Sequence, residues 1–319
     1  MKKLSRRLFL QCAGGLALAA AGTGSYAFGF EPALRLNITP YALKPPGWPS
    51  GLTVRAVVLA DIHACEPWMP ASRIRGIADL ANALSPDIIF LLGDFAGGHN
   101  FVTGPVMPDE WGKALSVLTA PLGVYSILGN HDWWHGPLPN MPPDGAQGVR
   151  RALRAAGIEV LENHALHLMK DGHGFWVAGL GDQLFAPNVQ ADLPGTLAQI
   201  TDADPVILLA HEPTIFRRVP ERVSLTLCGH THGGQVNLPM VTTKLSMRHD
   251  LSGLLYGHIV ENDRHLIISA GLGTSIVPVR FLRPPEIVHL TIGDDLVPRR
   301  REQLVGFRQP STVAKLLID

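Results

Sequence analysis

The segment VRAVVLADIH, residues 54–63, decides the fold, because a mostly apolar and β-branched run ends there at an aspartate and a histidine. Such a run is typical of a strand that is buried on both faces of a sheet. The pattern recurs in four further runs, at residues 88–92, 124–128, 206–210 and 225–228. The sequence therefore predicts five buried strands, each followed directly by polar residues.

Helical and shorter strand patterns complete the predicted fold. Residues 73–84 and 150–156 have the apolar spacing of amphipathic helices, and strands that alternate with helices indicate an α/β architecture. Residues 34–38 alternate as a half-buried strand, which we expect Pro40 to end. The strand-like runs 175–180, 266–270 and 287–291 are separated by no long helix, which predicts a second, more antiparallel sheet. We predict a two-sheet β sandwich flanked by helices.

The N-terminus has the composition of an export signal. Lys2, Lys3, Arg6 and Arg7 precede an apolar run at residues 8–21, which is shorter than the roughly 20 residues of a spanning helix. Residues 5–10, SRRLFL, resemble the twin-arginine signal, which a receptor reads as an address. The alternative is a charged, frayed terminus. We expect the twin-arginine machinery as a partner, a location in the periplasm or at the outer face of the membrane, and cleavage near residue 21 or 27.

Charge and cysteine content limit the classes of function and scaffold. Lys plus Arg equals Asp plus Glu at 27 each, so bulk binding of nucleic acid is not expected. Two cysteines remain after the signal, Cys65 and Cys228, and each lies two residues from a candidate metal ligand. A disulfide between them is conceivable in an oxidising compartment, but we favour two buried free thiols.

The polar residues that follow the five strands form a candidate metal site. Ligands outside the carboxyl ends of strands lie where α/β sheets place their functional sites. The set offers carboxylate, amide and imidazole donors without a thiolate, which favours Mn, Fe or Zn in a non-structural site. The donors are Asp61, His63, Asp94, Asn130, His211, His230 and His232, with His131 as a further imidazole.

These motifs resemble those of the calcineurin-like metallophosphoesterases, namely DxH, GD, GNH(D/E), H and GHxH. The resemblance covers about residues 51–290 and implies the sandwich fold. It further implies two metal ions about 3.5–4 Å apart that convert a bridging water to hydroxide for in-line attack on phosphorus. The implied ligands are Asp61, His63 and His232 for the first ion and Asn130, His211 and His230 for the second. Asp94 would bridge both ions, and His131 would protonate the leaving oxygen.

The motifs of this sequence differ from those of two branches of the family, which argues against membership of either branch. Purple acid phosphatases replace the first-motif histidine by glycine and carry a tyrosine where this chain has Gly97. Serine/threonine protein phosphatases continue the second motif as GDxxDRG, which is absent here, so the usual aspartate partner of the catalytic histidine is missing. Residues 229–235, 271–274, Pro278 and Arg280 look like a twin-arginine-exported, membrane-associated bacterial branch. Some relatives of that branch cleave a lipid-linked nucleotide sugar pyrophosphate.

The resemblance predicts an enzyme that hydrolyses phosphodiester or pyrophosphate bonds in a phosphoester small molecule or a lipid-linked substrate. The alternatives are a phosphomonoesterase and a metal-loaded binding protein without turnover. Arg280 is a candidate for binding substrate phosphate, with a structural ion pair as the alternative. Trp133 and Trp134 would line the substrate site or belong to the core, and His135 lies close to the active loop. The predicted organisation is a signal peptide (1–27), a strand and linker (28–50), the catalytic domain (51–295) and a tail (296–319).

Overall fold

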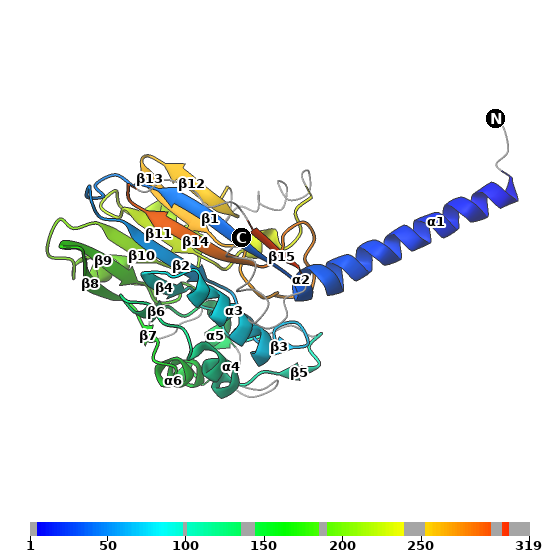
Figure 1. The fold of residues 1–319 in the computed structure, drawn as a ribbon, viewed down its shortest axis with the longest axis horizontal. Helices are drawn as coiled ribbons and strands as arrows, with labels where there is room; N and C mark the ends of the chain where they lie inside the picture. The colour runs from blue at the N-terminus through cyan, green and yellow to red at the C-terminus, as the bar shows by residue number, and fades with distance from the viewer. Residues whose placement is uncertain are drawn as a thin grey trace.

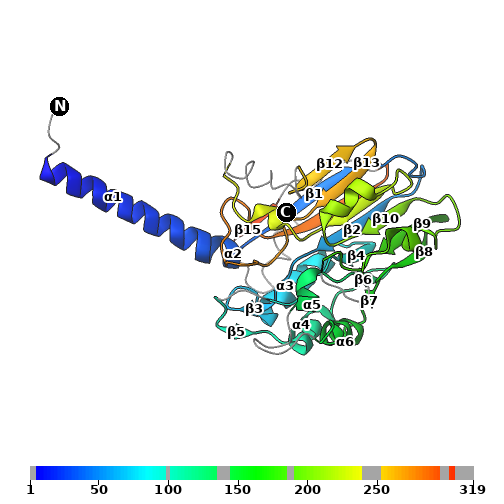
Figure 2. The same ribbon diagram turned by 180° about the vertical axis from the view of Figure 1, so that it is seen from behind.

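The computed structural model describes residues 5–97, 101–134, 144–184, 190–238, 253–294 and 302–305. Two β-sheets pack face to face, and helical segments cover their outer faces (Figure 1). A single long helix projects from this body next to α2 (Glu31–Leu34), as the reverse view also shows (Figure 2). The prediction of an α/β sandwich flanked by helices is confirmed.

The first sheet brings three of the predicted strand ends to one edge. Its spatial order is β15 (Glu302–Val305), β1 (Arg35–Leu43), β14 (Glu286–Ile292), β2 (Val54–Leu59), β4 (Ile88–Leu91), β6 (Val124–Ser126) and β7 (Glu159–Val160). Strands β2, β4, β6 and β7 are parallel, so their carboxyl ends share one edge. The run 287–291 was predicted for the second sheet, but it forms β14 beside β2. That prediction was wrong because hydrophobicity carries no information about the pairing partner.

The second sheet is parallel at its centre. Its spatial order is β12 (Gly257–Glu261), β13 (Arg264–Ile268), β11 (Leu225–Cys228), β10 (Val206–Leu209), β9 (His173–Gly179) and β8 (His164–Lys170). Only the edge strands β12 and β8 pair antiparallel, so the expected antiparallel character is found at the edges of this sheet and not at its centre. The crossovers run through α7 (Leu193–Leu197) and η2 (Pro213–Arg218), which are too short to show helical periodicity in the sequence.

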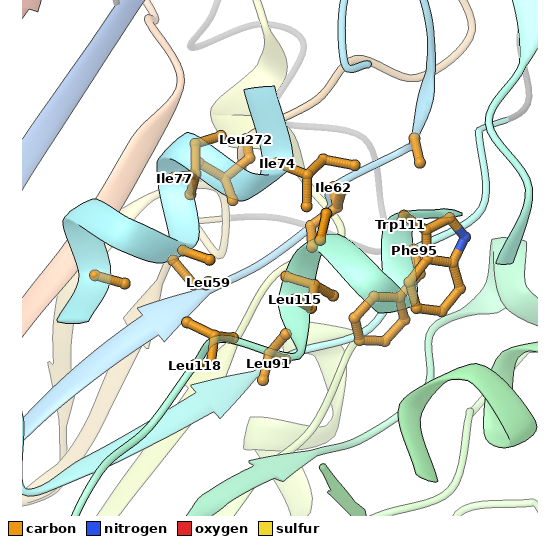
Figure 3. Packing of buried hydrophobic residues seen from close by; sticks show 14 of the residues in the cluster. Leu59, Ile62, Ile74, Ile77, Leu91, Phe95, Trp111, Leu115, Leu118 and Leu272 are labelled. Carbon is orange, nitrogen blue, oxygen red and sulfur yellow. The ribbon is translucent and has the colours of Figure 1, made fainter. Parts of the chain in front are cut away.

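Three helices cover the outer face of the first sheet. They are α3 (Ala71–Ala83), α4 (Pro108–Leu115) and α6 (Gln147–Ala155), and the first and last were predicted from sequence. Figure 3 shows Ile74 and Ile77 of α3 packed with Leu59 of β2 and Leu91 of β4. A two-stranded ladder of β3 (Cys65–Glu66) and β5 (Gly104–Pro105) lies in the loops beside these helices.

Alternation along β2 explains why this strand is buried on both faces. Val57 and Leu59 belong to the cluster under the helices, whereas Ala56 and Val58 belong to the cluster between the sheets. All four side chains are at most 2% exposed. Burying one valine or leucine side chain contributes about 1.5–3 kcal/mol. Because both faces of β2 are buried, a shift of register by one residue would not expose the strand but would place the wrong side chains in each layer.

Strand β1 continues through Pro40 to Leu43, so the prediction that Pro40 ends it was wrong. The neighbouring strand β15 pairs with β1 from Arg35 to Ile38, and Pro40 lies beyond that pairing. Proline is tolerated in a strand where one side needs no N–H donor. Sequence alone does not reveal where such an edge begins.

The N-terminal segment is one long helical unit. α1 (Arg6–Ser25) continues through η1 (Tyr26–Phe30) into α2. This 29-residue segment is long and apolar enough to cross a membrane, although a signal sequence passes the same test. It extends well beyond the apolar run at residues 8–21 that the sequence analysis took as its hydrophobic part, and none of the residues of α1 is buried.

Candidate metal centre

Five loops at the carboxyl ends of strands from both sheets meet in one buried site. Asp61 follows β2, Asp94 follows β4, and Asn130 starts the short helix α5 (Asn130–Trp134) after β6. From the second sheet, His211 follows β10, and His230 follows β11. Six of the seven predicted ligands are at most 3% exposed, and the seventh, His230, is partly exposed.

The first group of donors surrounds His63. One ligand atom each from Asp61, His63, Asp94 and His232 lies within 4.8 Å of the others. The Nε2 atoms of His63 and His232 are 3.0 Å apart, and Nε2 of His63 lies 3.4 Å from Oδ2 of Asp94. Two imidazole nitrogens at this distance need a proton or a cation between them. The arrangement fits a shared cation.

The second group of donors meets the first at Asp94. Its members Asp94, His211 and His230 also place ligand atoms within 4.8 Å of one another, and Nε2 of His211 lies 3.1 Å from Oδ2 of Asp94. Oδ1 of Asn130 lies 2.9 Å from Nδ1 of His230. The structure therefore brings all seven predicted ligands together, and Asp94 belongs to both groups.

Backbone carbonyls orient two of the ligand histidines. Nδ1 of His63 lies 3.0 Å from the carbonyl oxygen of Ala96, and Nδ1 of His211 lies 2.6 Å from that of Leu92. A carbonyl accepts, so each Nδ1 carries the proton and Nε2 keeps a free lone pair for a metal. The tautomer needed for ligation is thus fixed by strand-end backbone atoms.

The electrostatics of these ligands also favour a cation. Burial lowers the pKa of His63 to about 3 and that of His230 to about 4, which keeps both imidazoles neutral. Burial raises the pKa of Asp61 to about 7, helped by the charge of Asp94, and Oδ2 of Asp61 has no hydrogen-bond partner among the described residues. Burial would likewise raise the pKa of Asp94, but His211 and His131 hold it well below its usual range. The residues present therefore fit divalent metal ions.

Backbone strain is concentrated at the ligands. Five of the seven have a positive φ, a conformation that side-chain-bearing residues rarely adopt. They are Asp61 (52°), His63 (45°), Asp94 (57°), His230 (68°) and His232 (51°). Residues in this region cost about 1–3 kcal/mol each and cluster at functional sites, where surrounding contacts hold them. The fold accepts this cost to point the donors inward.

Glycine is required where two strand ends touch. A Cβ on Gly93, whose φ is 88°, would lie 2.3 Å from the backbone nitrogen of Gly129. A Cβ on Gly129 would lie 2.4 Å from Oδ1 of Asp94 and 2.6 Å from Cε1 of His211. The glycines of the GD and GNH motifs thus allow the backbone contact that brings Asp94 beside Asn130.

Asp132 is a structural residue whose role the sequence analysis missed. Its carboxylate accepts four backbone N–H bonds, from Asp94 and Gly129 at 2.9 Å, from Phe95 at 2.8 Å and from Ala96 at 3.1 Å. Burial, with the charge of Asp94, raises its pKa to about 7, while these N–H donors oppose the rise. Asp132 therefore ties the second motif to the third. Its place at the end of the quoted GNHD motif was the available signal.

His131 stands beside the metal ligands and contacts Ser275. Its ring packs edge-on against His63 at a centroid distance of 4.7 Å, and its Nε2 lies 3.2 Å from Oγ of Ser275. Its backbone N–H donates to Oδ1 of Asp94 at 2.8 Å. The sequence left open what orients the ring of His131, and Ser275 is one residue that contacts it. Burial lowers the pKa of His131, so the ring is predominantly neutral at pH 7.

Arg280 is buried among backbone carbonyl oxygens. Its side chain is fully buried, and its guanidinium donates to the carbonyl oxygens of Gly273 at 3.0 Å, Ala270 at 2.8 Å and Arg283 at 3.0 Å. It also lies 3.4 Å from Nδ1 of His232. The proposed role in binding substrate phosphate is therefore corrected: Arg280 holds the loop behind a metal ligand. Arginine motifs alone do not distinguish the two roles.

The remaining candidate residues are placed as follows. Trp133 is buried in the core under the helices and stacks with the guanidinium of Arg150 at 4.6 Å, so the core interpretation holds for it. Cys65 and Cys228 are buried and form no disulfide, as favoured from sequence. The side chain of Trp134, all of His135 and the tail at residues 306–319 lie outside the described residues.

Glu212 is a buried acid that sequence reasoning did not identify. It follows His211 and is 2% exposed, and its Oε2 accepts a bond from Nε2 of Gln183 at 2.8 Å. Burial raises its pKa to about 8, with a hydrogen bond to Asp182 contributing. Nothing in the sequence distinguished this glutamate from a surface residue.

Comparison with known proteins agrees with this geometry. Residues 54–262 match the calcineurin-like phosphoesterase family. The chain belongs to this family. As a calcineurin-like phosphoesterase, it carries the catalytic domain of a metal-binding phosphoesterase, and the clustered histidines and aspartates described above are its candidate metal site.

Relatives within the family have been given several activities. The phosphoesterase is 30% identical to the uncharacterized metallophosphoesterase YkuE of Bacillus subtilis, over 92% of this chain and 99% of the relative. It is 27% identical to the phosphodiesterase YaeI of Escherichia coli, over 91% and 99%. It is 25% identical to the UDP-2,3-diacylglucosamine pyrophosphatase LpxG of Chlamydia muridarum, over 73% and 82%.

Proposed function

We propose that this phosphoesterase hydrolyses phosphodiester or pyrophosphate bonds with two divalent ions drawn from Mn, Fe and Zn. The observation that carries the proposal is the pair of donor groups that share Asp94. A shared carboxylate between two clusters is what a dinuclear site requires. The names of the relatives YaeI and LpxG support a diester or pyrophosphate substrate over a monoester.

The residues would divide the work as follows. Asp61, His63 and His232 would hold one ion, Asn130, His211 and His230 the other, and Asp94 both. When bound, two such ions supply Lewis-acid activation of water and neutralise charge on the phosphoryl oxygens. His131, held beside the cage by Ser275 and by its bond to Asp94, would donate a proton to the leaving oxygen.

Protonation of the leaving oxygen needs an imidazolium, although burial lowers the pKa of His131. Among the groups near His131, the charge of Asp94 raises the pKa of its ring and the charge of His211 lowers it. A lowered pKa also makes the proton easier to transfer, so His131 would be a strong but sparsely protonated acid at pH 7. Activity on substrates with poor leaving groups should therefore be greatest on the acidic side of neutrality.

Two measurements test the proposed function together. Metal analysis of the purified protein should find two ions per chain, and the protein should cleave bis-nitrophenyl phosphate faster than mono-nitrophenyl phosphate. A preference for the monoester would favour the phosphomonoesterase alternative. Two bound ions without turnover of either compound would favour the metal-loaded binding protein.

Export through the twin-arginine route is part of the same proposal. It is supported by the paired Arg6 and Arg7 at the start of the exposed, largely apolar helix α1. The catalytic domain at residues 51–295 would then face the periplasm or the outer surface of the membrane.

A further inference from the structure

The lower part of the N-terminal helical segment is built into the catalytic domain. The carboxylate of Glu31 is fully buried and accepts backbone N–H bonds from Leu282 at 3.0 Å and Arg283 at 2.6 Å. The backbone N–H of Arg280 donates to the carbonyl oxygen of Ala27 at 2.9 Å. A buried carboxylate would be costly without these bonds, so the loop at residues 280–283 and the helical segment depend on each other.

A second set of contacts holds the same segment through Trp68 and Arg73. The indole N–H of Trp68 donates to the carbonyl oxygen of Phe28 at 2.9 Å, and the guanidinium of Arg73 donates to that of Pro32 at 2.6 Å. The ring of Tyr26 packs edge-on against Phe281 at 6.0 Å. Signal cleavage after residue 27 would remove Tyr26 and Ala27 from this arrangement. The contacts favour a segment that stays attached.

Exposed apolar side chains gather around this junction. They form a surface that we call the apolar rim, consisting of Phe28 (50% exposed), Phe30 (36%), Ile276 (78%), Val277 (37%) and Leu282 (51%). Ile276 and Leu282 have φ values of 66° and 55°. Such backbone conformations favour glycine or asparagine, and a β-branched residue there is a genuine outlier. An isoleucine side chain that is 78% exposed, with further exposed apolar side chains around it, points to an apolar environment outside the chain.

The apolar rim is connected directly to the metal centre. Ser275, whose Oγ lies 3.2 Å from Nε2 of His131, immediately precedes Ile276. The side chain of Gln235, three residues after His232, accepts from the backbone N–H of Ser275 at 2.7 Å and donates to the carbonyl of Val277 at 3.2 Å. One loop thus carries both a contact of His131 and the most exposed residues of the rim.

Length and charge indicate how the helix would sit in a bilayer. Residues 8–27 form 20 consecutive residues without a charge, enough for about 30 Å of hydrocarbon at about 1.5 Å per residue. Lys2, Lys3, Arg6 and Arg7 precede this stretch, which favours a cytoplasmic N-terminus. The domain then emerges on the other face, with aromatic residues of the rim at the depth where interfacial aromatic side chains gather.

We propose that the N-terminal helix is retained as a membrane anchor and that the apolar rim seats in the outer surface of the bilayer. The metal centre would then face phosphoesters carried by membrane lipids. The anchoring and seating stand on the contacts above, whereas the substrate class also rests on the proposed function. The continuity of the rim with a helix able to span a membrane commits the surface to a bilayer.

Seating of the rim is tested by a fluorophore placed at residue 276 in the full chain. In a Cys12→Ser background, Ile276→Cys is labelled, and Met169→Cys serves as the exposed control (56% exposed). The control residue belongs to β8, a strand at the end of the body opposite α1 (Figures 1 and 2). Cys65 and Cys228 are buried, with pKa values raised by burial, so they should not react. The protein is reconstituted in phosphatidylethanolamine and phosphatidylglycerol vesicles containing nitroxide-labelled lipid.

Nitroxide should quench the fluorophore at residue 276 strongly and the one at residue 169 weakly. Equal quenching at the two positions overturns the seating of the rim. Intact-mass analysis of protein from the native membrane fraction should find residues 8–27 still attached. A chain that starts at residue 22 or 28 overturns the anchor. Neither readout depends on turnover, so failure of the proposed hydrolysis is recognised separately, by lack of cleavage of bis-nitrophenyl phosphate by the parent protein.

A polar substitution tests the substrate class. Ile276→Asn suits the left-handed backbone, so its melting temperature and metal content should not fall, while Met169→Asn is the matched control. With hexadecyl nitrophenyl phosphate in vesicles, hydrolysis should release nitrophenol and hexadecyl phosphate. Loss of one buried apolar side chain should weaken this reaction about tenfold in Ile276→Asn. Equal rates for the two variants would contradict a rim that positions the site at the lipid surface.

Discussion

The four N–H bonds to Asp132 give the sharpest prediction of the structure. In Asp132→Asn, one side-chain oxygen remains and keeps two of the backbone donors, whereas the new amide group faces the other two donors with its own hydrogens. Two buried N–H groups lose their partner at about 1–3 kcal/mol each, so we expect a loss of about 2–6 kcal/mol in the free energy of unfolding. For a domain of this size, the melting temperature should fall by at least about 4 °C.

The matched control is Asp79→Asn, which removes only a surface ion pair with Arg75 at 3.1 Å. Such a pair contributes at most about 0.5 kcal/mol. Thermal unfolding of both variants, in metal-free and metal-loaded form, gives the two losses directly. Because Asp132 positions the backbone of Asp94, the loaded variant should also bind metal more weakly. Equal melting temperatures for the two variants would refute the assignment of Asp132 as the link between the two motifs.

Four further predictions concern the cage, catalysis, export and pH. Asp94→Asn should lower occupancy of both metal sites, and two tightly held ions in metal analysis would disprove sharing. His131→Asn should keep both ions, yet slow hydrolysis of substrates with alkoxide leaving groups by about 10²–10⁴-fold and of substrates that release nitrophenolate much less. Equal losses of rate on the two kinds of substrate would exclude His131 as a general acid. Lysine at Arg6 and Arg7 should strand folded protein in the cytoplasm, as fractionation would detect. The pKa of Glu212 in the folded protein, about 8, exceeds its ordinary value of 4.5, so its stabilising contribution is complete below pH 4.5 and is lost as the pH rises toward 8. The melting temperature of the metal-free protein should therefore fall less between pH 6.5 and 8.5 in Glu212→Gln than in the parent protein.

Strand ends and ligands were predictable from sequence because each depends on local order along the chain. The run at residues 54–63 contains both the apolar strand and the donors that follow it, and the same holds for the segment ending at Asp94. Partner choice between strands is not local, which is why β14 and the parallel centre of the second sheet were missed. The short crossovers α7 and η2 left no periodic signal.

Roles that depend on contacts across the fold were also beyond the sequence. Ser275 lies 144 positions from His131, and no spacing rule joins them. From its motif, Arg280 was a candidate for binding substrate phosphate, but in the fold its guanidinium donates to backbone carbonyl oxygens. Ile276 appears in the sequence as an ordinary apolar loop residue, and only its backbone conformation and exposure distinguish it.

The division of the ligands between the two sheets has a consequence for the order of assembly. Asp61, Asp94 and Asn130 extend from the first sheet, whereas His211 and His232 extend from the second, so neither sheet alone contains a complete set. The bond from the backbone N–H of His230 to Oδ1 of Asp61, at 2.8 Å, joins the two halves at the same point. Ions bound there would link the two sheets, and they could bind to the full set of ligands only after residue 232 has been synthesised and the two sheets have packed together. The metals in the finished protein are then those available in the compartment where that packing takes place.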